Sequence, residues 1–210
     1  MTSDHNKVVL ALRAGIASTA LHQDLEALTQ ACFAYLTLLH KWNGAYNLTA
    51  VRSMEDMVSR HILDSLAILP WVEGNRVLDV GTGAGLPGIP LALACPDKHV
   101  VLLDSNGKKT RFLSEVQRAL HLSNVEIVQS RVEHYQPALP FDTVVSRAFS
   151  DMQSMLEQTK HLLAPGGQWV AMKGSQVNLE LSSLASEYRI ESYSLAGVEG
   201  ERCCVIIDYK

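Results

Sequence analysis

The sequence is poor in the residues that would indicate a metal centre, a disulfide framework or a strongly charged binding surface. Its 210 residues contain four cysteines and 6% aromatic residues, and the formal net charge is −4. Cys32, Cys95, Cys203 and Cys204 form no Cys-x-x-Cys pair, which predicts buried thiols in a reducing compartment and no metal site. So small a charge disfavours a non-specific nucleic-acid binder but permits a local basic patch.

Long hydrophobic runs and hydrolase motifs are missing as well. Residues 1–10 are polar and then briefly apolar, too short for the core of a signal peptide or for a membrane span, so we expect a cytoplasmic protein without a membrane partner. The chain shows no Ser-His-Asp set and no cysteine placed as a nucleophile after a pocket strand. The 47% of hydrophobic residues nevertheless suffices for one packed domain with an appendage.

The most informative segment is residues 76–88, where an apolar strand pattern that ends at Asp79 runs into a glycine-rich turn. Four glycines follow, at Gly81, Gly83, Gly85 and Gly88. Glycines let the main chain approach a ligand where a Cβ would collide. A second apolar run, residues 99–103, ends in Asp104, and an acid at that place would face a ribose diol. Together these features predict a pocket for an adenosine-containing cofactor.

The residues around the glycines favour S-adenosylmethionine over NAD, although Gly83-x-Gly85-x-x-Gly88 also matches the dinucleotide pattern. Leu86-Pro87 fills the space where a pyrophosphate would meet free backbone N–H groups, and Pro87 has none. Asp79 would repel phosphate and attract the cationic amino group of a methionine tail. S-adenosylmethionine is therefore the predicted cofactor, and NAD or a glycine turn without a ligand are the alternatives.

Residues 1–70 are expected to form an N-terminal helical extension, and residues 71–210 the cofactor-binding domain. Apolar residues recur every three or four positions from Leu21 to Leu39, which predicts a long helix ended by Asn43-Gly44. Ser53 begins a capping box for a second helix, which should run to Pro70.

After residue 75, strand and helix patterns alternate, which predicts a parallel sheet. Strands are expected at residues 76–80, 99–103, 125–129, 141–146 and 168–172, with residues 165–167 as a turn into the last of them. Helices are expected at residues 89–95, 108–120, 152–163 and around 177–187. Two final runs, residues 189–195 and 203–208, should form an antiparallel hairpin. The predicted fold class is α/β, Rossmann-like, with a mostly parallel seven-stranded sheet.

Ligands of an open parallel sheet bind beyond the carboxyl ends of its strands, and this rule selects the candidate pocket residues. These are Asp79, Gly81, Gly83, Gly85, Leu86, Asp104, Ser130, Arg131, Val132, Glu133, Ser146, Arg147, Ala148, Phe149, Lys173 and Gly174. Asp104 is expected to accept hydrogen bonds from the ribose, with a helix cap as the alternative. Val132 and Glu133 are expected near adenine, although Glu133 could equally be a solvated acid in a first helical turn.

Arg147 follows an apolar strand directly, so we expect it at the mouth of the pocket. It could pair with a cofactor carboxylate, with a substrate phosphate or with a guanine edge. Phe149 could stack on a base or close the core. His61 and Asp64 should lie on one face of the second helix, where a satisfied buried pair is the expected role and catalysis the alternative.

A series of motifs along the chain resembles one known family. The motifs are Trp42-Asn43, Tyr46-Asn47-Leu48-Thr49, Arg60-His61-Ile62-Leu63-Asp64-Ser65, residues 79–91, Leu103-Asp104-Ser105 with Lys108-Lys109 and Arg111-Phe112-Leu113, Ser130-Arg131-Val132-Glu133, Ser146-Arg147-Ala148 and Lys173-Gly174. They are similar to those of the bacterial 16S rRNA guanine-N7 methyltransferases, the glucose-inhibited division protein B family. Position 84 is alanine where the family often has proline or glycine, and the segment after Gly174 matches only loosely.

The resemblance implies a class I methyltransferase domain at residues 71–210 and methyl transfer from S-adenosylmethionine to N7 of guanine 527 in 16S rRNA. It also implies cofactor contacts at Gly81, Leu86, Val132, Glu133 and Arg147. Guanine N7 carries a lone pair and no proton, so the reaction needs no general base and depends on orientation and electrostatics. Arg147 and Ser146 are the candidate catalytic residues, which would fix the base by its O6 edge.

The partner would be 16S rRNA or a precursor of the small ribosomal subunit, bound by a protein that we expect to be a monomer. Candidate RNA-binding residues are Lys108, Lys109, Arg111 and Lys173, although the first two could instead be an ordinary solvated helix start. Basic residues do not help a helix N-terminus, which favours a phosphate role. Alternative functions are methylation of another RNA, of a protein or of a small molecule, and cofactor binding without turnover.

Overall fold

The computed structural model describes residues 3–19, 24–147, 149, 151–174, 181, 184, 186–195 and 201–210. Within these residues, seven strands form one sheet in the order β3-β2-β1-β4-β5-β7-β6. The strands are β1 (Arg76–Val80), β2 (His99–Asp104), β3 (Val125–Gln129), β4 (Phe141–Ser146), β5 (Leu163–Gly174), β6 (Arg189–Tyr193) and β7 (Arg202–Asp208). The pairs among β1 to β5 are parallel, and β7 pairs antiparallel with both β5 and β6. The predicted mixed α/β sheet is confirmed.

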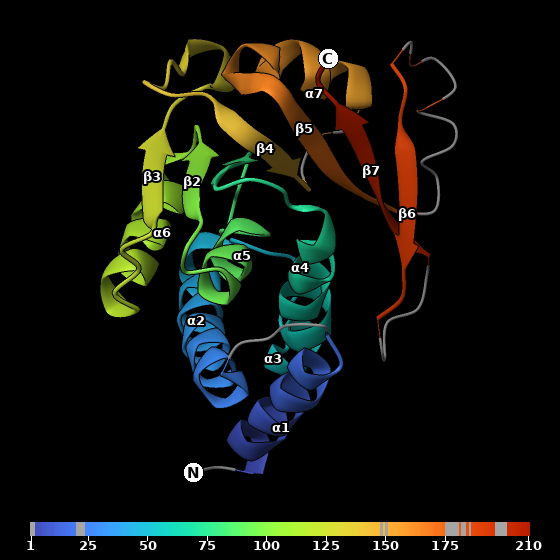
Figure 1. Cartoon of the computed structure of the whole chain (residues 1–210). Coiled ribbons are helices and arrows are strands. Elements are labelled where there is room, and N and C mark those ends of the chain that lie inside the picture. The colour runs from blue at the N-terminus through green and yellow to red at the C-terminus, as the bar shows by residue number, and fades with distance from the viewer. Residues whose placement is uncertain are drawn as a thin grey trace.

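Helices cover the two faces of the sheet (Figure 1). They are α1 (Ser3–Ala17), α2 (Leu25–Tyr46), α3 (Met54–Met57), the π-helix η1 (Val58–Leu63), α4 (Asp64–Ala67), α5 (Gly88–Ala94), α6 (Gly107–Ala119) and α7 (Met152–Thr159). Short 3-10 helices are η2 (Leu69–Trp71), η3 (Val132–His134) and η4 (Lys160–Leu162). One apolar cluster joins one face of the sheet to the helices from α1 to α6, and a second joins the other face to α7. Because the first cluster is continuous across residue 70, the division into two domains there stays a prediction.

Helix α2 begins at Leu25 and continues past the predicted stop at Asn43-Gly44. Asp24 caps its start through hydrogen bonds from the N–H groups of Glu26 and Ala27, and the helix ends at Tyr46, before Asn47 in the left-handed conformation. The prediction that Asn43-Gly44 ends the helix was wrong. The Asn43 side chain instead bonds the loop that follows, donating to the Val51 carbonyl and accepting from the Thr49 N–H.

The segment after that loop begins as predicted but changes its helix type. The Ser53 hydroxyl accepts the Asp56 N–H at 3.3 Å, and the chain then continues through α3, η1, α4 and η2 to Trp71. The π-helical stretch in the middle was not predicted. None of the described helices is long and apolar enough to cross a membrane.

Strand β5 starts before the predicted turn at residues 165–167, which was wrong as a boundary. Its pairing with β4 shifts register between Phe141 and Thr143, so the Pro-Gly-Gly segment is an irregular part of the strand. Gly166 and Gly167 also exchange backbone hydrogen bonds with Tyr209. The helix expected around residues 177–187 lies largely outside the described residues.

The strand order fixes where a ligand can bind. Strand β1 has β2 on one side and β4 on the other, so the chain reverses its direction of winding between β1 and β4. This is the switch point at whose carboxyl end open α/β sheets hold their ligands. The segments that follow β1, β2, β3 and β4 converge at this point.

Candidate active site

The turn between β1 and α5 has a backbone that only glycine adopts easily. Gly81, Gly83 and Gly85 have φ values of 68°, 61° and 91°. A Cβ on Gly85 would lie 2.5 Å from Ile89 Cγ1, so packing also requires glycine there. A Cβ on Gly83 would meet no atom closer than 3.9 Å. That Cβ would thus meet only the Gly81 carbonyl and the Lys109 ammonium, both at 3.9 Å, so packing does not require glycine there and the bare backbone leaves room for a closely approaching ligand.

Asp79 lies under this turn and is fully buried. Its Oδ2 accepts the Thr82 hydroxyl at 2.6 Å and the Gly88 N–H at 2.8 Å, which fastens the turn to the start of α5. Its Oδ1 is buried without a hydrogen-bond partner among the described residues. Burial raises the pKa of Asp79 to about 6, against the hydrogen bonds from Thr82 and Gly88, which lower it. The orphaned oxygen fits the cationic amino group that the sequence predicts there.

Asp104, at the end of β2, joins the turn from the other side. Its Oδ2 accepts the Gly83 N–H at 2.9 Å and lies 3.3 Å from Lys109 Nζ, and its Oδ1 accepts the Asn106 N–H at 2.9 Å. The cap of α6 is Asn106, whose side chain accepts the Lys108 N–H. The helix-cap alternative for Asp104 is therefore not needed, and its carboxylate lies beside the open face of Gly83.

The remaining cofactor candidates surround these two acids. Leu86 is buried in the apolar cluster below the turn, Val132 is half-buried in η3, and Glu133 is exposed. The Ser130 N–H donates to the Asp104 carbonyl at 3.3 Å, which places the start of η3 next to Asp104, the residue expected to bind the ribose. These positions agree with an adenosine lying across the ends of β1, β2 and β3.

Tyr35 is a supporting residue that the sequence pattern assigned only to a helix face. Its hydroxyl donates to the Ala84 carbonyl at 2.8 Å, so α2 holds the glycine turn directly. Burial raises the pKa of Tyr35, so the hydroxyl keeps its proton and remains a donor. The only sequence signal was the choice of tyrosine at a position that otherwise takes an apolar side chain.

The end of β4 carries Ser146 and Arg147, which point to different partners. The buried Ser146 hydroxyl donates to the Val80 carbonyl at 3.0 Å, which ties β4 to β1. Arg147 Nη1 donates to the Arg60 carbonyl at 3.2 Å and lies 3.8 Å from Asp64 Oδ2. Arg147 thus pairs with the helical segment η1–α4, and its role toward a ligand stays a prediction, whereas the Ser146 proton is engaged within the sheet.

The other residues expected after β4 and β5 lie beside this pair. Lys173 Nζ donates to the Phe149 carbonyl at 3.0 Å, and Phe149 packs against the second apolar cluster. Ala148 lies outside the described residues. Of the RNA candidates on α6, Lys108 and Arg111 are exposed, whereas Lys109 is partly covered and directed at Asp104.

His61 is a satisfied buried side chain. Its Nε2 lies 2.8 Å from the Thr49 hydroxyl, and its Nδ1 lies 2.9 Å from the Arg60 carbonyl. Burial, followed by the charge of Arg147, lowers the pKa of His61 to about 4. The ring is therefore neutral near pH 7, with Nδ1 as donor and Nε2 as acceptor.

Asp64 gathers partners that are far apart in the sequence. Its Oδ1 accepts the Tyr193 hydroxyl and Arg202 Nη1, both at 3.1 Å, while its Oδ2 faces Arg147. Burial raises its pKa, and the two arginines oppose that shift. Tyr193 and Arg202 were not among the sequence candidates, because nothing local in the sequence links them to Asp64. No group of three or more potential metal ligands occurs in the described part of the chain.

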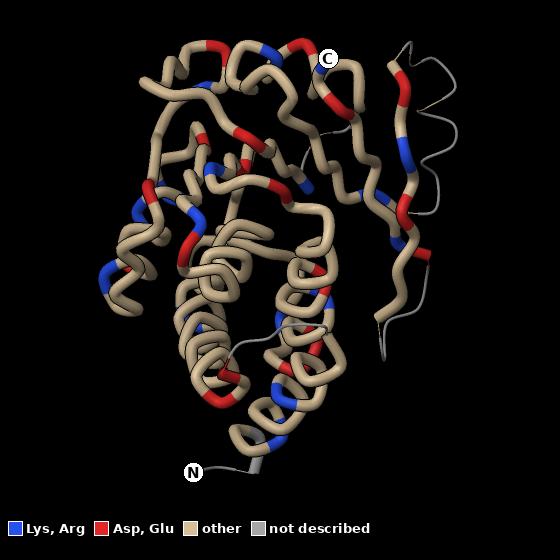
Figure 2. Tube along the Cα trace, in the orientation of Figure 1, with Lys and Arg blue, Asp and Glu red and all other residues tan. Residues whose placement is uncertain are grey.

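Charge on the surface is mixed, as the composition predicts. Figure 2 shows acidic and basic residues interspersed along helices and strands alike. The exposed residues Lys108 and Arg111 lie in the first turns of α6, close in sequence to Asp104. This region thus brings together the carboxylate of Asp104, the Asp79 oxygen without a hydrogen-bond partner among the described residues, and nearby guanidinium and ammonium groups.

Comparisons with known proteins agree with this geometry. The family model described as GidB, rRNA small subunit methyltransferase G, matches residues 28–202. The chain is 53% identical over 205 residues to ribosomal RNA small subunit methyltransferase G of Legionella pneumophila, covering 98% of this chain and 97% of that protein. It is 48% identical over 209 residues to the protein of the same name from Pseudomonas aeruginosa, covering 98% and 96%.

Solved structures show the same architecture at low sequence identity. A SAM-dependent methyltransferase from Aquifex aeolicus matches with a TM-score of 0.54 and 20% identity, covering 70% of this chain and 90% of that one. The METTL16 methyltransferase domain matches with a TM-score of 0.58 and 13% identity, covering 84% and 96%. At these identities the likeness supports the fold alone.

Proposed function

The chain belongs to the family of rRNA small subunit methyltransferase G, and we propose that it transfers a methyl group from S-adenosylmethionine to N7 of guanine 527 in 16S rRNA. The observation that carries the proposal is the open backbone of Gly83 between two buried carboxylates, in a chain of this family. Asp79 offers an orphaned oxygen on one side, and Asp104 offers its carboxylate on the other.

The cofactor would lie across the ends of β1 to β4. Asp104 would accept the ribose hydroxyls, and Asp79 Oδ1 would accept the amino group of the methionine tail. Backbone and side chains around the ligand would come from Gly81, Gly83, Gly85, Leu86, Val132, Glu133 and Arg147. When bound, the cofactor supplies an electrophilic methyl group on a sulfonium.

The main contribution of the protein to the reaction would be to orient the two reactants, because guanine N7 has a lone pair and no proton to remove. Positioning of two reactants can lower a barrier by as much as about 7–11 kcal/mol. Arg147 would fix the base through its O6 edge or the cofactor through its carboxylate. Ser146 is proposed to act indirectly, because its hydroxyl donates to the Val80 carbonyl and so holds the end of β4 in place.

RNA would approach over α6 and the end of β5. Lys108 and Arg111 are exposed, which suits contacts with phosphates, and Lys173 lies beside Phe149 at the mouth. We also propose that Lys109 contributes to RNA binding. Its ammonium contacts Asp104, so it would do so from the side of the site that holds the cofactor. Because the basic group is small, we propose that the substrate is a shaped rRNA loop or a precursor of the small ribosomal subunit. We also propose that the protein is a monomer in the cytoplasm.

Two experiments test this proposal. In a transfer assay with methyl-labelled S-adenosylmethionine, the purified protein should label 16S rRNA from cells that lack this gene, and should not label fully modified rRNA. Calorimetry should show binding of S-adenosylhomocysteine and no binding of NAD. The opposite ligand preference would refute the cofactor assignment, and binding without transfer to any RNA would favour a cofactor-binding protein without turnover.

A further inference from the structure

Asp64 joins the C-terminal hairpin, the helical segment and the mouth of the candidate active site. Only 2% of its surface is exposed, although it carries an ionisable side chain in the middle of an apolar cluster. Its two oxygens have different partners. Oδ1 is held by Tyr193 and Arg202, whereas Oδ2 faces the Arg147 guanidinium.

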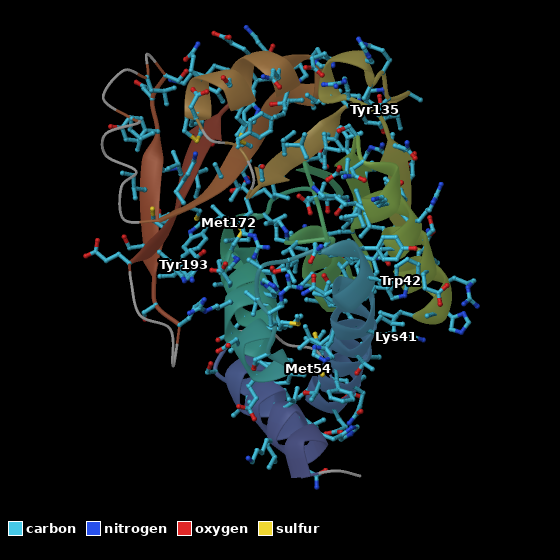
Figure 3. The ribbon with its side chains drawn as sticks, turned by 180° about the vertical axis from the view of Figure 1, so that it is seen from behind. Lys41, Trp42, Met54, Tyr135, Met172 and Tyr193 are labelled. Atoms are coloured by element: carbon cyan, nitrogen blue, oxygen red, sulfur yellow. The ribbon has the colours of Figure 1, made fainter. Side chains whose placement is uncertain are left out.

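The hairpin side of this arrangement is firmly built. Tyr193 on β6 and Arg202 on β7 are directly paired residues in the antiparallel ladder. Both donate to the same oxygen at 3.1 Å, so the register of the hairpin sets the position of the carboxylate. Figure 3 shows Tyr193 between the hairpin and the helical column that contains α4. The carboxylate is therefore fixed independently of Arg147.

The helical side is shaped by the π-helix η1. The Asp64 N–H donates to the Ser59 and His61 carbonyls rather than to Arg60, its partner in a regular α-helix. Arg147 Nη1 donates to the Arg60 carbonyl at 3.2 Å. The irregular turn thus presents a carbonyl and a carboxylate side by side to one guanidinium nitrogen.

We propose that Asp64 is a positioning residue for the methyl transfer, which orients Arg147 across the mouth while Tyr193 and Arg202 hold Asp64 in place. The inference rests on the proposed function, in which Arg147 contacts cofactor or base. The Arg60 carbonyl and Asp64 Oδ2 together restrict the guanidinium, and an arginine fixed in this way loses less conformational freedom when it binds a ligand. Charge supports the same role, because two guanidiniums face one carboxylate and positive charge remains for an anionic ligand.

A double-mutant cycle separates positioning from mere stability. Asp64→Asn keeps an oxygen for Tyr193 and Arg202 and removes the negative charge that faces Arg147. It should weaken S-adenosylhomocysteine binding or lower kcat by about tenfold, which is the lower end of the losses found when the partners that orient metal ligands are removed. In an Arg147→Gln background, the same change should have less than about threefold effect, because the oriented group is gone.

The control is Asp208→Asn, which breaks the exposed pair of Asp208 with Arg189 on the same hairpin. It should leave binding and kcat at their wild-type values. Effects of Asp64→Asn that are equal in both backgrounds, or a loss of melting temperature without any change in binding or kcat, would overturn the proposal. If Asp64→Asn does not fold, the same cycle with Tyr193→Phe decides, because that change loosens Oδ1 and retains the charge.

The cycle also distinguishes failure of this inference from failure of the proposed function. It can be measured in S-adenosylhomocysteine affinity alone, without any RNA. A wild-type protein that binds the cofactor product but methylates no RNA would refute the proposed activity, and coupling between Asp64 and Arg147 in the affinities would then still support the orientation of Arg147 by Asp64 for cofactor binding. Additive affinities in a protein that methylates 16S rRNA would refute the positioning role in cofactor binding, and additive kcat values would complete the refutation.

Discussion

Asp104 Oδ2 accepts the backbone N–H of Gly83 at 2.9 Å, so the carboxylate assigned to the ribose also holds the glycine turn. This hydrogen bond adds a side-chain contact between segments 21 residues apart, which the N–H groups of Gly81 and Thr82 also join by donating to the Leu103 carbonyl. A change at Asp104 should therefore affect both the ligand contact and the shape of the turn that faces it.

Replacement of Asp104 by alanine should weaken S-adenosylhomocysteine binding by about tenfold or more, because charge-assisted hydrogen bonds contribute on the order of 1.5–3 kcal/mol. Calorimetric titration measures this directly. Asp97→Ala, which removes an exposed acid just before β2, is the matched control and should bind normally. Near-wild-type affinity of Asp104→Ala would remove the ribose assignment.

Alanine substitutions at Gly83 and at Gly85 should differ in their effects on stability and on ligand binding. Alanine at either position requires a left-handed backbone, which costs about 1–2 kcal/mol. At Gly85 the added methyl would also collide with Ile89 and Leu113, so Gly85→Ala should lower the melting temperature further. At Gly83 the methyl has room but occupies the ligand side. Gly83→Ala should fold with a smaller loss of melting temperature and bind S-adenosylhomocysteine at least about tenfold more weakly. Equal binding losses in refolded samples of both variants would argue against Gly83 as the contact point.

Titration of Asp79 should make both stability and cofactor binding depend on pH. Its folded pKa of about 6 lies above the ordinary 3.8, so the folded state holds the proton more tightly than the unfolded chain. The stability that this group contributes at low pH is therefore lost as the pH rises from about 4 to about 6. Binding of a cationic amino group should strengthen over the same rise, because the carboxylate forms. Asp79→Asn should lack both trends in thermal-melt and titration series from pH 4 to 7, and identical pH profiles of variant and wild type would contradict the assignment.

His61 should have the opposite effect on stability. Burial lowers its folded pKa to about 4 from 6.5, so the unfolded chain takes up the proton first as the pH falls. The contribution of this residue to stability is then complete above about pH 6.5 and is lost as the pH falls toward 4. His61→Gln should unfold less steeply with acid than the wild type in denaturant titrations at several pH values. A steeper acid dependence in the variant would show that the ring is charged in the folded protein.

Substitutions at Lys108 and Arg111 should affect RNA binding alone, whereas a substitution at Lys109 should also affect cofactor binding. Reversal of charge at Lys108 and Arg111 should weaken RNA binding and reduce the salt dependence of log K by roughly one to two units, since each phosphate contact contributes about one. Lys109→Glu should in addition weaken S-adenosylhomocysteine binding, because Lys109 Nζ lies 3.3 Å from Asp104. Filter binding of 16S rRNA fragments across a salt series, with parallel calorimetry, distinguishes the two groups. A loss of cofactor binding without any change in RNA binding in the Lys108 and Arg111 variant would mean that these residues do not form an RNA track.

Local patterns predicted the strands of the parallel sheet well, because a buried strand between glycine-rich turns has a distinctive composition. The same rules misplaced the end of α2 and the start of β5. At Asn43 a side-chain bond to the following loop replaces the expected helix stop, and at Gly166 pairing with Tyr209 absorbs the Pro-Gly-Gly segment into the strand. Tertiary partners decide both boundaries, and they are not visible in a window of neighbouring residues.

The candidate site also contains some residues that local sequence patterns predicted and others that they did not. Asp79, the glycines and Asp104 follow from the rule that ligands bind at the carboxyl ends of parallel strands, and the structure brings them together. Asp64 with Tyr193 and Arg202 could not be found from spacing, because 129 and 138 residues separate Asp64 from these partners and β7 inserts between β5 and β6. The sequence indicated that Arg147 lies at the mouth but not that a carboxylate holds it there.

The central claim is best tested by mapping N7-methylguanine in 16S rRNA from cells with this gene, from cells without it and from cells that carry only the Asp104→Ala variant. The account predicts methylation of guanine 527 in the first, its absence in the second and a strong reduction in the third. Full methylation of guanine 527 in cells without the gene would contradict it.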